Sequence, residues 1–208
     1  MGIGMVTVEL KGLSKAFGSR VLFRDVELKL HSGQCLVVTG RNGSGKTTLL
    51  RIIAGLARPS RGQVVITDGA GAMDPSRLRK HLGLVAPDLV LYDELTALEN
   101  LFFFARIRGI PPDQDRSEAL LEYVGLQGRG GELVGTFSSG MKQRLKYAYA
   151  IQHSPSVLLL DEPTTNLDDD GVEMARRVIT AQRERGVLVL ATNNAEETAY
   201  GDQVLRLG

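Results

Sequence analysis

The stretch GRNGSGKTT, Gly40 to Thr48, fits the pattern G-x-x-x-x-G-K-[ST] and decides the fold. An apolar run, CLVVTG, leads into it, and the helical pattern KTTLLRIIAGL continues from it. Glycines let the backbone turn so tightly that successive N–H groups point at phosphate oxygens, and the positive end of the following helix adds to the attraction. Because the pattern lies between an expected strand and an expected helix, it predicts a phosphate-binding loop rather than a chance glycine turn.

Two side chains of this loop have specific expected roles. Lys46 can reach the β- and γ-phosphates of a nucleotide, and the hydroxyl of Thr47 can ligate Mg²⁺. The residues expected to bind the nucleotide are Gly40, Arg41, Asn42, Gly43, Ser44, Gly45, Lys46, Thr47 and Thr48.

An acidic pair supports this interpretation. In SVLLLDEP an apolar run carries Asp161 and Glu162 to the carboxyl end of an expected strand, where ligands bind in open α/β sheets. The two carboxylates could merely cap a turn, but their repulsion makes that alternative costly. One can hold Mg²⁺, and the other can take a proton from an attacking water. The chemistry alone therefore predicts a Mg²⁺-dependent nucleotide hydrolase.

The order of elements predicts an α/β fold with one inserted helical segment. MVTVEL and VLFRDVELKL alternate like strands of a half-exposed antiparallel layer, whereas CLVVTG is typical of a strand buried on both faces. Helical patterns dominate from about residue 89 to residue 153. We expect a single domain, 1–208, in which 1–88 and 154–208 form the α/β core and 89–153 the helical subdomain.

Composition narrows the class of protein. The chain has 208 residues, with 25 Lys and Arg against 24 Asp and Glu, so its net charge of +1 gives no general reason to expect a nucleic-acid partner. The single cysteine, Cys35, lies in an apolar stretch and indicates a buried thiol in a reducing compartment. No run approaches the roughly 18 to 20 apolar residues of a membrane-spanning helix, and MGIGMVTVEL is unlike a secretory signal.

Taken together, the motifs resemble those of the ATP-binding cassette (ABC) ATPases, and they follow in that family's order. GRNGSGKTT matches the Walker A loop, VLLLDEP the Walker B strand, and TNLD, ending at Asp168, the D-loop. FSSGMKQRL resembles the signature motif, and Phe17 occupies the position of the aromatic residue that stacks on adenine. The resemblance implies a P-loop NTPase of ABC type, with a RecA-like core, an antiparallel β subdomain and an inserted helical subdomain.

The signature motif implies a dimer. In the family, the residues that align with Ser138, Ser139, Gly140 and Met141 face the γ-phosphate of ATP held by a second subunit, although here they could simply cap the following helix. Ser139 replaces a usual glycine and Met141 a usual glutamine. The resemblance assigns catalytic roles to Glu162, Asn193 and Asp168, and the metal to Thr47 and Asp161, with ATP and Mg²⁺ as cofactors.

Two positions depart from the family. VLATNN places Asn193 where a histidine usually touches the γ-phosphate, whereas Asn194 could cap the segment AEETAY. The loop APDLVLYDELT lacks the usual glutamine, and either Pro87 or Asp88 takes its place. Asp88 could supply a hard oxygen ligand to Mg²⁺. Because loss of such a γ-phosphate contact typically costs about 10² to 10³ in rate, we predict slow basal hydrolysis.

The resemblance also implies partners: a second cassette, expected to be another copy of this chain, and a separate membrane permease that holds it at the cytoplasmic face of the cell membrane. Leu101 to Gly109 and Leu89 to Tyr92 are the expected docking region. The length and motifs favour a small exporter, including the haem-exporter subunit of cytochrome c maturation. The alternatives are a soluble nucleotide-gated clamp and a cassette that binds ATP for regulation but hardly hydrolyses it.

Overall fold

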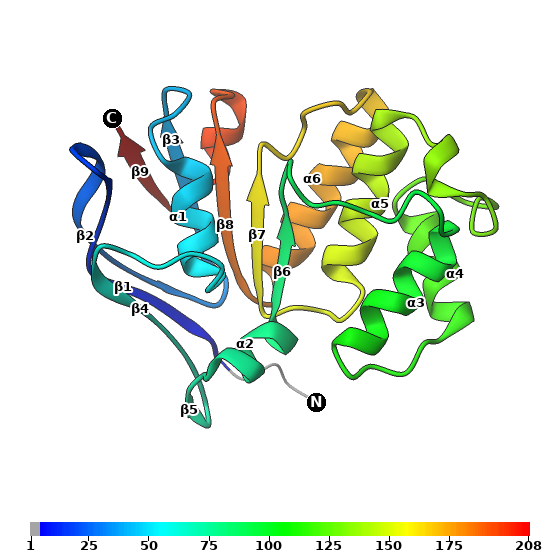
Figure 1. The fold of residues 1–208 in the computed structure, drawn as a ribbon, viewed down its shortest axis with the longest axis horizontal. Coiled ribbons are helices and arrows are strands. Elements are labelled where there is room, and N and C mark those ends of the chain that lie inside the picture. Colours follow the sequence, from blue (N-terminus) through cyan, green and yellow to red (C-terminus); the bar gives the residue numbers. More distant parts are fainter. Residues whose placement is uncertain (1–4) are drawn as a thin grey trace.

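Two sheets of different type organise the chain in the computed structural model, which describes residues 5–208 (Figure 1). The antiparallel sheet has the order β2-β1-β4-β5, and its strands are β1 (Thr7–Phe17), β2 (Arg20–His31), β4 (Arg61–Asp68) and β5 (Gly71–Ala72). The parallel sheet has the order β6-β7-β8-β3-β9, and its strands are β3 (Cys35–Gly40), β6 (Leu82–Val85), β7 (Val157–Asp161), β8 (Val187–Thr192) and β9 (Gln203–Leu207).

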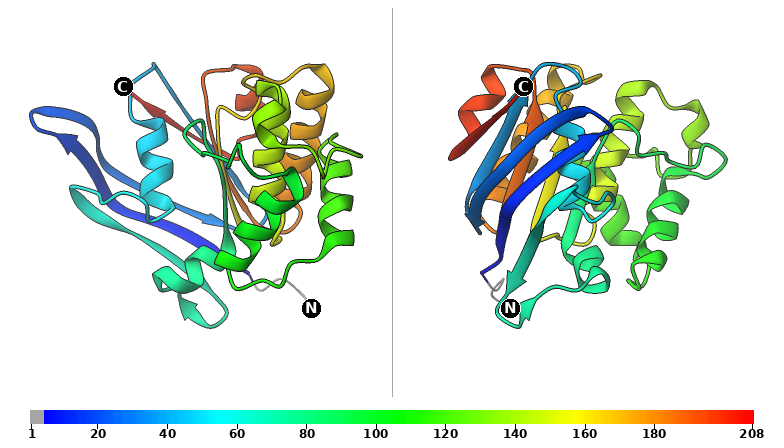
Figure 2. Two further views of the ribbon diagram at one scale, coloured as in Figure 1. Left: turned by 45° about the vertical axis from the view of Figure 1, so that its right-hand side comes forward. Right: turned by 60° about the vertical axis from the view of Figure 1, so that its left-hand side comes forward.

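Helices cover both faces of the parallel sheet. The α-helices are α1 (Lys46–Ile53), α2 (Pro75–His81), α3 (Ala97–Ile107), α4 (Gln114–Tyr123), α5 (Ser139–Ile151) and α6 (Asp169–Arg183), and the short 3-10 helices are η1 (Val134–Thr136) and η2 (Glu196–Tyr200). α1 lies between the two sheets, whereas α3, α4, α5 and α6 lie on the opposite side of the parallel sheet (Figures 1 and 2). Among residues 5–208, no helix combines the length and the apolar character that a membrane crossing requires.

The alternation of side chains along the central strands builds two hydrophobic cores. In β3, Cys35 and Val37 face the core shared with α5 and α6, whereas Leu36 and Val38 face the core shared with α1 and the antiparallel sheet. Because both faces are covered, every residue of β7 and β8 is buried. The buried Cys35 fits the prediction of a structural thiol, since burial raises the pKa of its thiol to about 12.

The predicted α/β fold is confirmed. The antiparallel layer, the strand after the helical segment and the last strand occur where the sequence patterns place them, and α3, α4 and α5 fall within 89–153. α5 nevertheless packs against β6 and shares one hydrophobic core with the parallel sheet. The division at residues 89 and 153 stays a prediction, and residues 1–4 of the predicted core lie outside the described residues.

Candidate active site

Three parallel strands bring the predicted polar groups to one edge of the sheet. β8 lies between β7 and β3, and all three run in the same direction. The glycine-rich loop follows β3, Asp161 ends β7 and Glu162 follows it, and Thr192 ends β8 and Asn193 follows it (Figure 1). Ligands of parallel α/β sheets bind at this carboxyl edge, so the candidate site lies here.

The loop between β3 and α1 has the backbone that its glycines predict. Three glycines of the loop have positive φ angles, which residues with a Cβ rarely adopt: 149° at Gly40, 78° at Gly43 and 107° at Gly45. A Cβ on Gly40 would lie 2.2 Å from the carbonyl oxygen of Leu207. The loop is also held from outside, because Arg20 donates a 2.8 Å hydrogen bond to the carbonyl oxygen of Gly43. No pattern in the sequence indicated this role of Arg20.

Lys46 is the first residue of α1 and reaches back over the loop. It is only 6% exposed, and its ammonium donates to the carbonyl oxygen of Gly40 at 3.0 Å and to Oδ1 of Asn193 at 2.8 Å. Its Nζ also lies 3.6 Å from Oε1 of Glu162. The structure therefore brings together three residues that the sequence singled out separately.

Asp161 provides a buried carboxylate. It is 2% exposed, and neither carboxylate oxygen has a hydrogen-bond partner within residues 5–208. Burial raises the pKa of Asp161, and the nearby Thr47 hydroxyl and Lys46 offset this only in part. A divalent cation would satisfy the unpaired oxygens. Mg²⁺ commonly uses one or two protein oxygens together with substrate phosphates, so Thr47 and Asp161 fit such a site.

Glu162 leaves the strand in an unusual conformation. Its φ of 50° is in the left-handed region, and its N–H donates a 2.8 Å hydrogen bond to the carbonyl oxygen of Ala191 in β8. Its side chain is 29% exposed. Non-glycine residues in this region are strained, and such strain concentrates at functional sites. The turn directs Glu162 toward Lys46, whereas Asp161 stays buried.

The end of β8 separates its two asparagines. Nδ2 of Asn193 donates a 2.6 Å hydrogen bond to Oδ1 of Asn42 in the phosphate loop, so Asn193 bridges Lys46 and Asn42. The side chain of Asn194 instead accepts from the N–H of Glu196 at 2.9 Å, at the start of η2. Asn194 therefore closes a local turn before η2, whose N-cap residue is Ala195, and the phosphate loop is the partner of Asn193.

Phe17 and Asp88 lie at the periphery of the site. Phe17 ends β1 and is 58% exposed, so it is not an ordinary core aromatic, and Nζ of Lys15 lies 4.5 Å from its ring centroid. The adenine-stacking role of Phe17 stays a prediction. The carboxylate of Asp88 forms a 2.7 Å ion pair with Arg51 of α1, and its predicted role at the metal is untested.

The predicted signature residues form the first turn of α5. Oγ of Ser138 caps the helix by accepting from the N–H of Met141 at 3.2 Å, and both Ser138 and Ser139 are exposed. A Cβ on Gly140 would lie 3.0 Å from the carbonyl oxygen of Asn166. The helix end therefore packs closely against the loop after β7 and still presents hydroxyl groups at the surface.

Asp168 does not join the cluster around Lys46. Its carboxylate caps α6 by accepting from the N–H of Gly171 and pairs with Arg144 of α5, which is the main reason for its lowered pKa. Within residues 5–208, no hydrogen bond or ion pair connects Asp168 to Lys46 or Glu162. Its catalytic role stays a prediction, whereas its structural role is to join α5 to α6.

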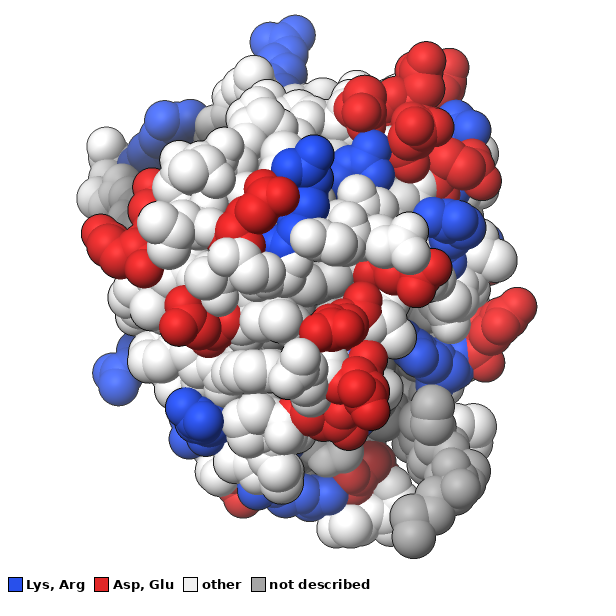
Figure 3. Space-filling view, turned by 90° about the vertical axis from the view of Figure 1, so that its right-hand side faces the viewer, with Lys and Arg blue, Asp and Glu red and all other residues white. Residues whose placement is uncertain are grey.

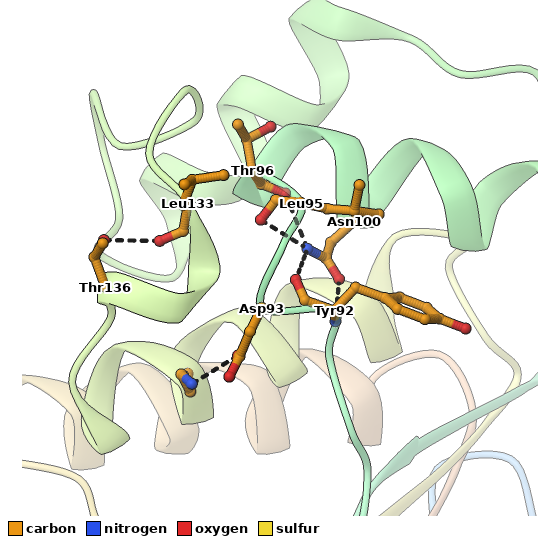
Figure 4. Close-up of polar contacts among 8 residues, drawn as sticks. Tyr92, Asp93, Leu95, Thr96, Asn100, Leu133 and Thr136 are labelled. Carbon is orange, nitrogen blue, oxygen red and sulfur yellow. Dashed lines mark hydrogen bonds and ion pairs between the residues drawn. The ribbon is translucent and has the colours of Figure 1, made fainter.

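A buried asparagine fixes the connection between β6 and α3. Asn100 is fully buried, and its amide bonds to the N–H and carbonyl oxygen of Tyr92 and to the carbonyl oxygens of Leu95 and Thr96 (Figure 4). Nearby, Lys142 of α5 forms a 2.7 Å ion pair with Asp93. An amide within the apolar helix ALENLFFFARI was a signal that our sequence reasoning missed.

A groove of about 370 Å³ opens between the segment that follows α1 and the elements α2, β6, α3 and α5. Leu56 and Ile107 line it and are 68% and 66% exposed, and its basic residues are Arg79, Lys80 and Arg108. The charged residues that line the groove are all basic, whereas acidic and basic side chains are mixed over the face of the molecule shown in Figure 3.

The groove overlaps the predicted docking region in part, because Phe104, Ile107 and Arg108 lie within Leu101 to Gly109. Of the three consecutive phenylalanines only Phe104 lines the groove, and Leu89 to Tyr92 do not. Tyr92 instead packs against Phe103, with ring centroids 4.9 Å apart.

Comparisons with known proteins agree on one family. The family model described as ABC transporter matches residues 23–165. The bacitracin transport ATP-binding protein BcrA of Bacillus licheniformis is 36% identical over 188 residues, which cover 90% of this chain and 61% of that protein. The ABC transporter ATP-binding protein NatA of Bacillus subtilis is 35% identical over 189 residues, which cover 88% of this chain and 77% of that protein. The chain spans only 61–62% of the length of the first curated relatives it matches.

Solved structures give the same result. A structure described as an ATP binding subunit of an ABC transporter superimposes with a TM-score of 0.83 at 27% identity, over 96% of this chain and 85% of that one. A dimeric, post-hydrolysis structure of the ATP-binding cassette MJ0796, bound to ADP and Pi, gives a TM-score of 0.82 at 25% identity, over 96% of this chain and 94% of that one.

Proposed function

Because the chain belongs to the ABC transporter family of ATP-binding proteins, we propose that it is the ATP-hydrolysing subunit of a transporter. One observation carries the proposal. A single sheet edge holds a phosphate loop, a buried lysine, a buried carboxylate with unpaired oxygens and a second, partly exposed carboxylate. These are the groups that phosphoryl transfer to water requires.

The chain's own residues supply positioning and proton transfer. The loop N–H groups, the amino end of α1 and Lys46 bind the phosphates. Glu162 orients a water and accepts its proton as the water oxygen bonds to the γ-phosphorus. The bond between the γ-phosphorus and the β,γ-bridging oxygen then breaks, and ADP and inorganic phosphate are released. Thr47 and Asp161 would hold Mg²⁺, which neutralises phosphate charge.

Hydrolysis by this chain is expected to be slow on its own. Asn193 occupies the position of the family's usual histidine, and its neutral amide cannot take up a proton. In the structure, the amide is engaged by Lys46 and Asn42. Slow turnover with intact nucleotide binding is the expected combination.

Two copies of the chain would complete two active sites. The exposed hydroxyls of Ser138 and Ser139, at the positive end of α5, suit a phosphate held by a second subunit. The dimeric state of the solved cassette at 25% identity supports this arrangement. ATP would then lie between the phosphate loop of one copy and the signature turn of the other.

A membrane subunit would dock in the groove between the segment that follows α1 and the elements α2, β6, α3 and α5. Its exposed apolar residues, Leu56 and Ile107, and its basic rim suit an amphipathic segment with acidic side chains. In this proposal the chain would lie at the cytoplasmic face of a membrane. Export is the direction we favour, because relatives of the chain are named for bacitracin transport, linearmycin resistance and Nod factor export.

Phosphate release from Mg²⁺-ATP by the purified chain tests the proposed activity, with Lys46→Ala as the matched inactive variant. Activity that survives Lys46→Ala would contradict the assignment of the site.

Membrane association tests the proposed membrane partner. We expect the wild-type chain to co-sediment with membranes. The double variant with Leu56→Glu and Ile107→Glu should stay in the supernatant. A chain that sediments instead with ribosomes or nucleic acid would favour the soluble clamp.

A further inference from the structure

The surroundings of Lys46 show more than a lysine beside a phosphate loop. An ammonium has three N–H donors, and Lys46 has three acceptors within reach: the Gly40 carbonyl oxygen, Oδ1 of Asn193 and Oε1 of Glu162. The first two are hydrogen bonds of 3.0 and 2.8 Å, whereas the third is an ion pair at 3.6 Å. Because the Glu162 contact is too long for a hydrogen bond, the third N–H donor of Lys46 is the one that a phosphate can take, in competition with Glu162.

The contacts also determine which way the Asn193 amide faces. Lysine can only donate hydrogen bonds, so the amide oxygen of Asn193 must face Lys46. The amide nitrogen then points at the phosphate loop, where it donates to Oδ1 of Asn42 at 2.6 Å. The NH₂ group that could have contacted a γ-phosphate directly is thus engaged with the loop.

We propose that Asn193 is a positioning residue, which holds Lys46 through its oxygen and the phosphate loop through its nitrogen. This inference rests on the proposed function and assigns Asn193 a role at the same site. Phosphate replaces Glu162, the longest of the three contacts, while Gly40 and Asn193 keep Lys46 in place. The exchange releases the carboxylate of Glu162, which then takes up its role with water.

Positioning and direct γ-phosphate contact differ in their consequences for binding. A direct contact affects only nucleotides that carry a γ-phosphate. A contact that orders Lys46 and the loop affects ADP and ATP alike, because both carry the β-phosphate that Lys46 reaches. The ratio of the two affinities therefore distinguishes the two roles.

The experiment measures dissociation constants for ADP and for a non-hydrolysable ATP analogue by calorimetry, with Mg²⁺, in the full chain. We expect Asn193→Ala to weaken both ligands about five- to tenfold, because it removes a hydrogen bond to a charged group at an exposed residue. Asn194→Ala is the matched control. It removes the neighbouring exposed amide, which bonds to Glu196 and not to the loop, so both constants should stay unchanged.

A double-mutant cycle adds an independent measurement. If Asn42 and Asn193 act together, Asn42→Ala weakens ADP to a similar extent, and the double variant is within about twofold of Asn193→Ala. Fully additive losses would overturn the proposal, as would loss of affinity for the ATP analogue alone. Wild-type protein that binds neither nucleotide would overturn the proposed function as well, whereas wild-type binding that Asn193→Ala leaves unchanged would overturn this inference only.

Discussion

Two regions of the molecule differ in how far one chain completes them. One is the phosphate edge, which comprises the phosphate loop, Glu162 and Asn193, and the other is the signature turn, Ser138 to Met141. At the phosphate edge, Lys46 has contacts to groups at the carboxyl ends of β3, β7 and β8, all in the same chain. At the signature turn, the exposed Ser138 and Ser139 lie on one turn of α5, whose internal contacts only anchor the helix. The first region therefore has its polar groups assembled within one chain, whereas in the proposed dimer the second would act on a phosphate held by another copy. Substitutions can therefore separate binding from hydrolysis.

The largest effect should come from Glu162→Gln. Loss of the proton acceptor should reduce turnover about 10² to 10⁴-fold while nucleotide still binds, because the loop and Lys46 are intact. Phosphate release and calorimetry on the same preparation measure the two quantities. Glu173→Gln, on the exposed face of α6, is the control and should change neither. Equal loss of binding and turnover would show that the phosphate edge does not bind independently of Glu162.

Ser138→Ala should reduce turnover about 10- to 100-fold by removing a hydrogen bond to a charged phosphate. It also removes a helix cap, so Asp113→Ala, which removes the cap of α4, controls for lost stability.

Mixing the two variants tests whether sites are shared between copies. If they are, mixing Ser138→Ala with Lys46→Ala leaves one complete site in each mixed dimer. The mixture should then exceed the mean activity of the two separate variants, and an activity equal to the mean would argue against shared sites.

Asn193→His should raise turnover about tenfold, because it restores the family's usual side chain at the end of β8 and the imidazole can also take up a proton. Steady-state phosphate release at saturating ATP measures the change. Asn194→His is the matched control and should leave turnover near that of the wild type. Unchanged turnover in Asn193→His would refute the explanation of slow hydrolysis by this residue.

The smallest effect is expected from Asp88→Ala, which should raise the Mg²⁺ concentration for half-maximal hydrolysis by up to about fivefold. The limit is small because the Asp88 side chain is 58% exposed, and contacts between exposed charges contribute under about 1 kcal/mol. An unchanged Mg²⁺ requirement would remove Asp88 from the metal site. Arg51→Ala separates the alternatives, since the same change in that variant would assign the effect to the ion pair.

Much of the fold was predictable because the signals are local. The glycine spacing from Gly40 to Gly45 and the apolar runs before Gly40 and Asp161 depend only on neighbouring residues, and the structure contains the predicted strands and helix. Contacts of other groups were not predictable. The bonds of Asn100 to Tyr92 and the ion pair of Arg51 with Asp88 depend on how a loop folds back on helices, which no periodicity encodes.

The sequence by itself determined the family, the phosphate loop and the carboxylates available for chemistry, because residue type and spacing limit what a short segment can do. Only the tertiary structure decided what Asn193 touches. Asn193 lies 147 residues from Lys46 along the chain, and the two meet because β8 lies between β7 and β3. Strand order follows from packing of the whole sheet, so no local pattern could have placed that amide between Lys46 and Asn42.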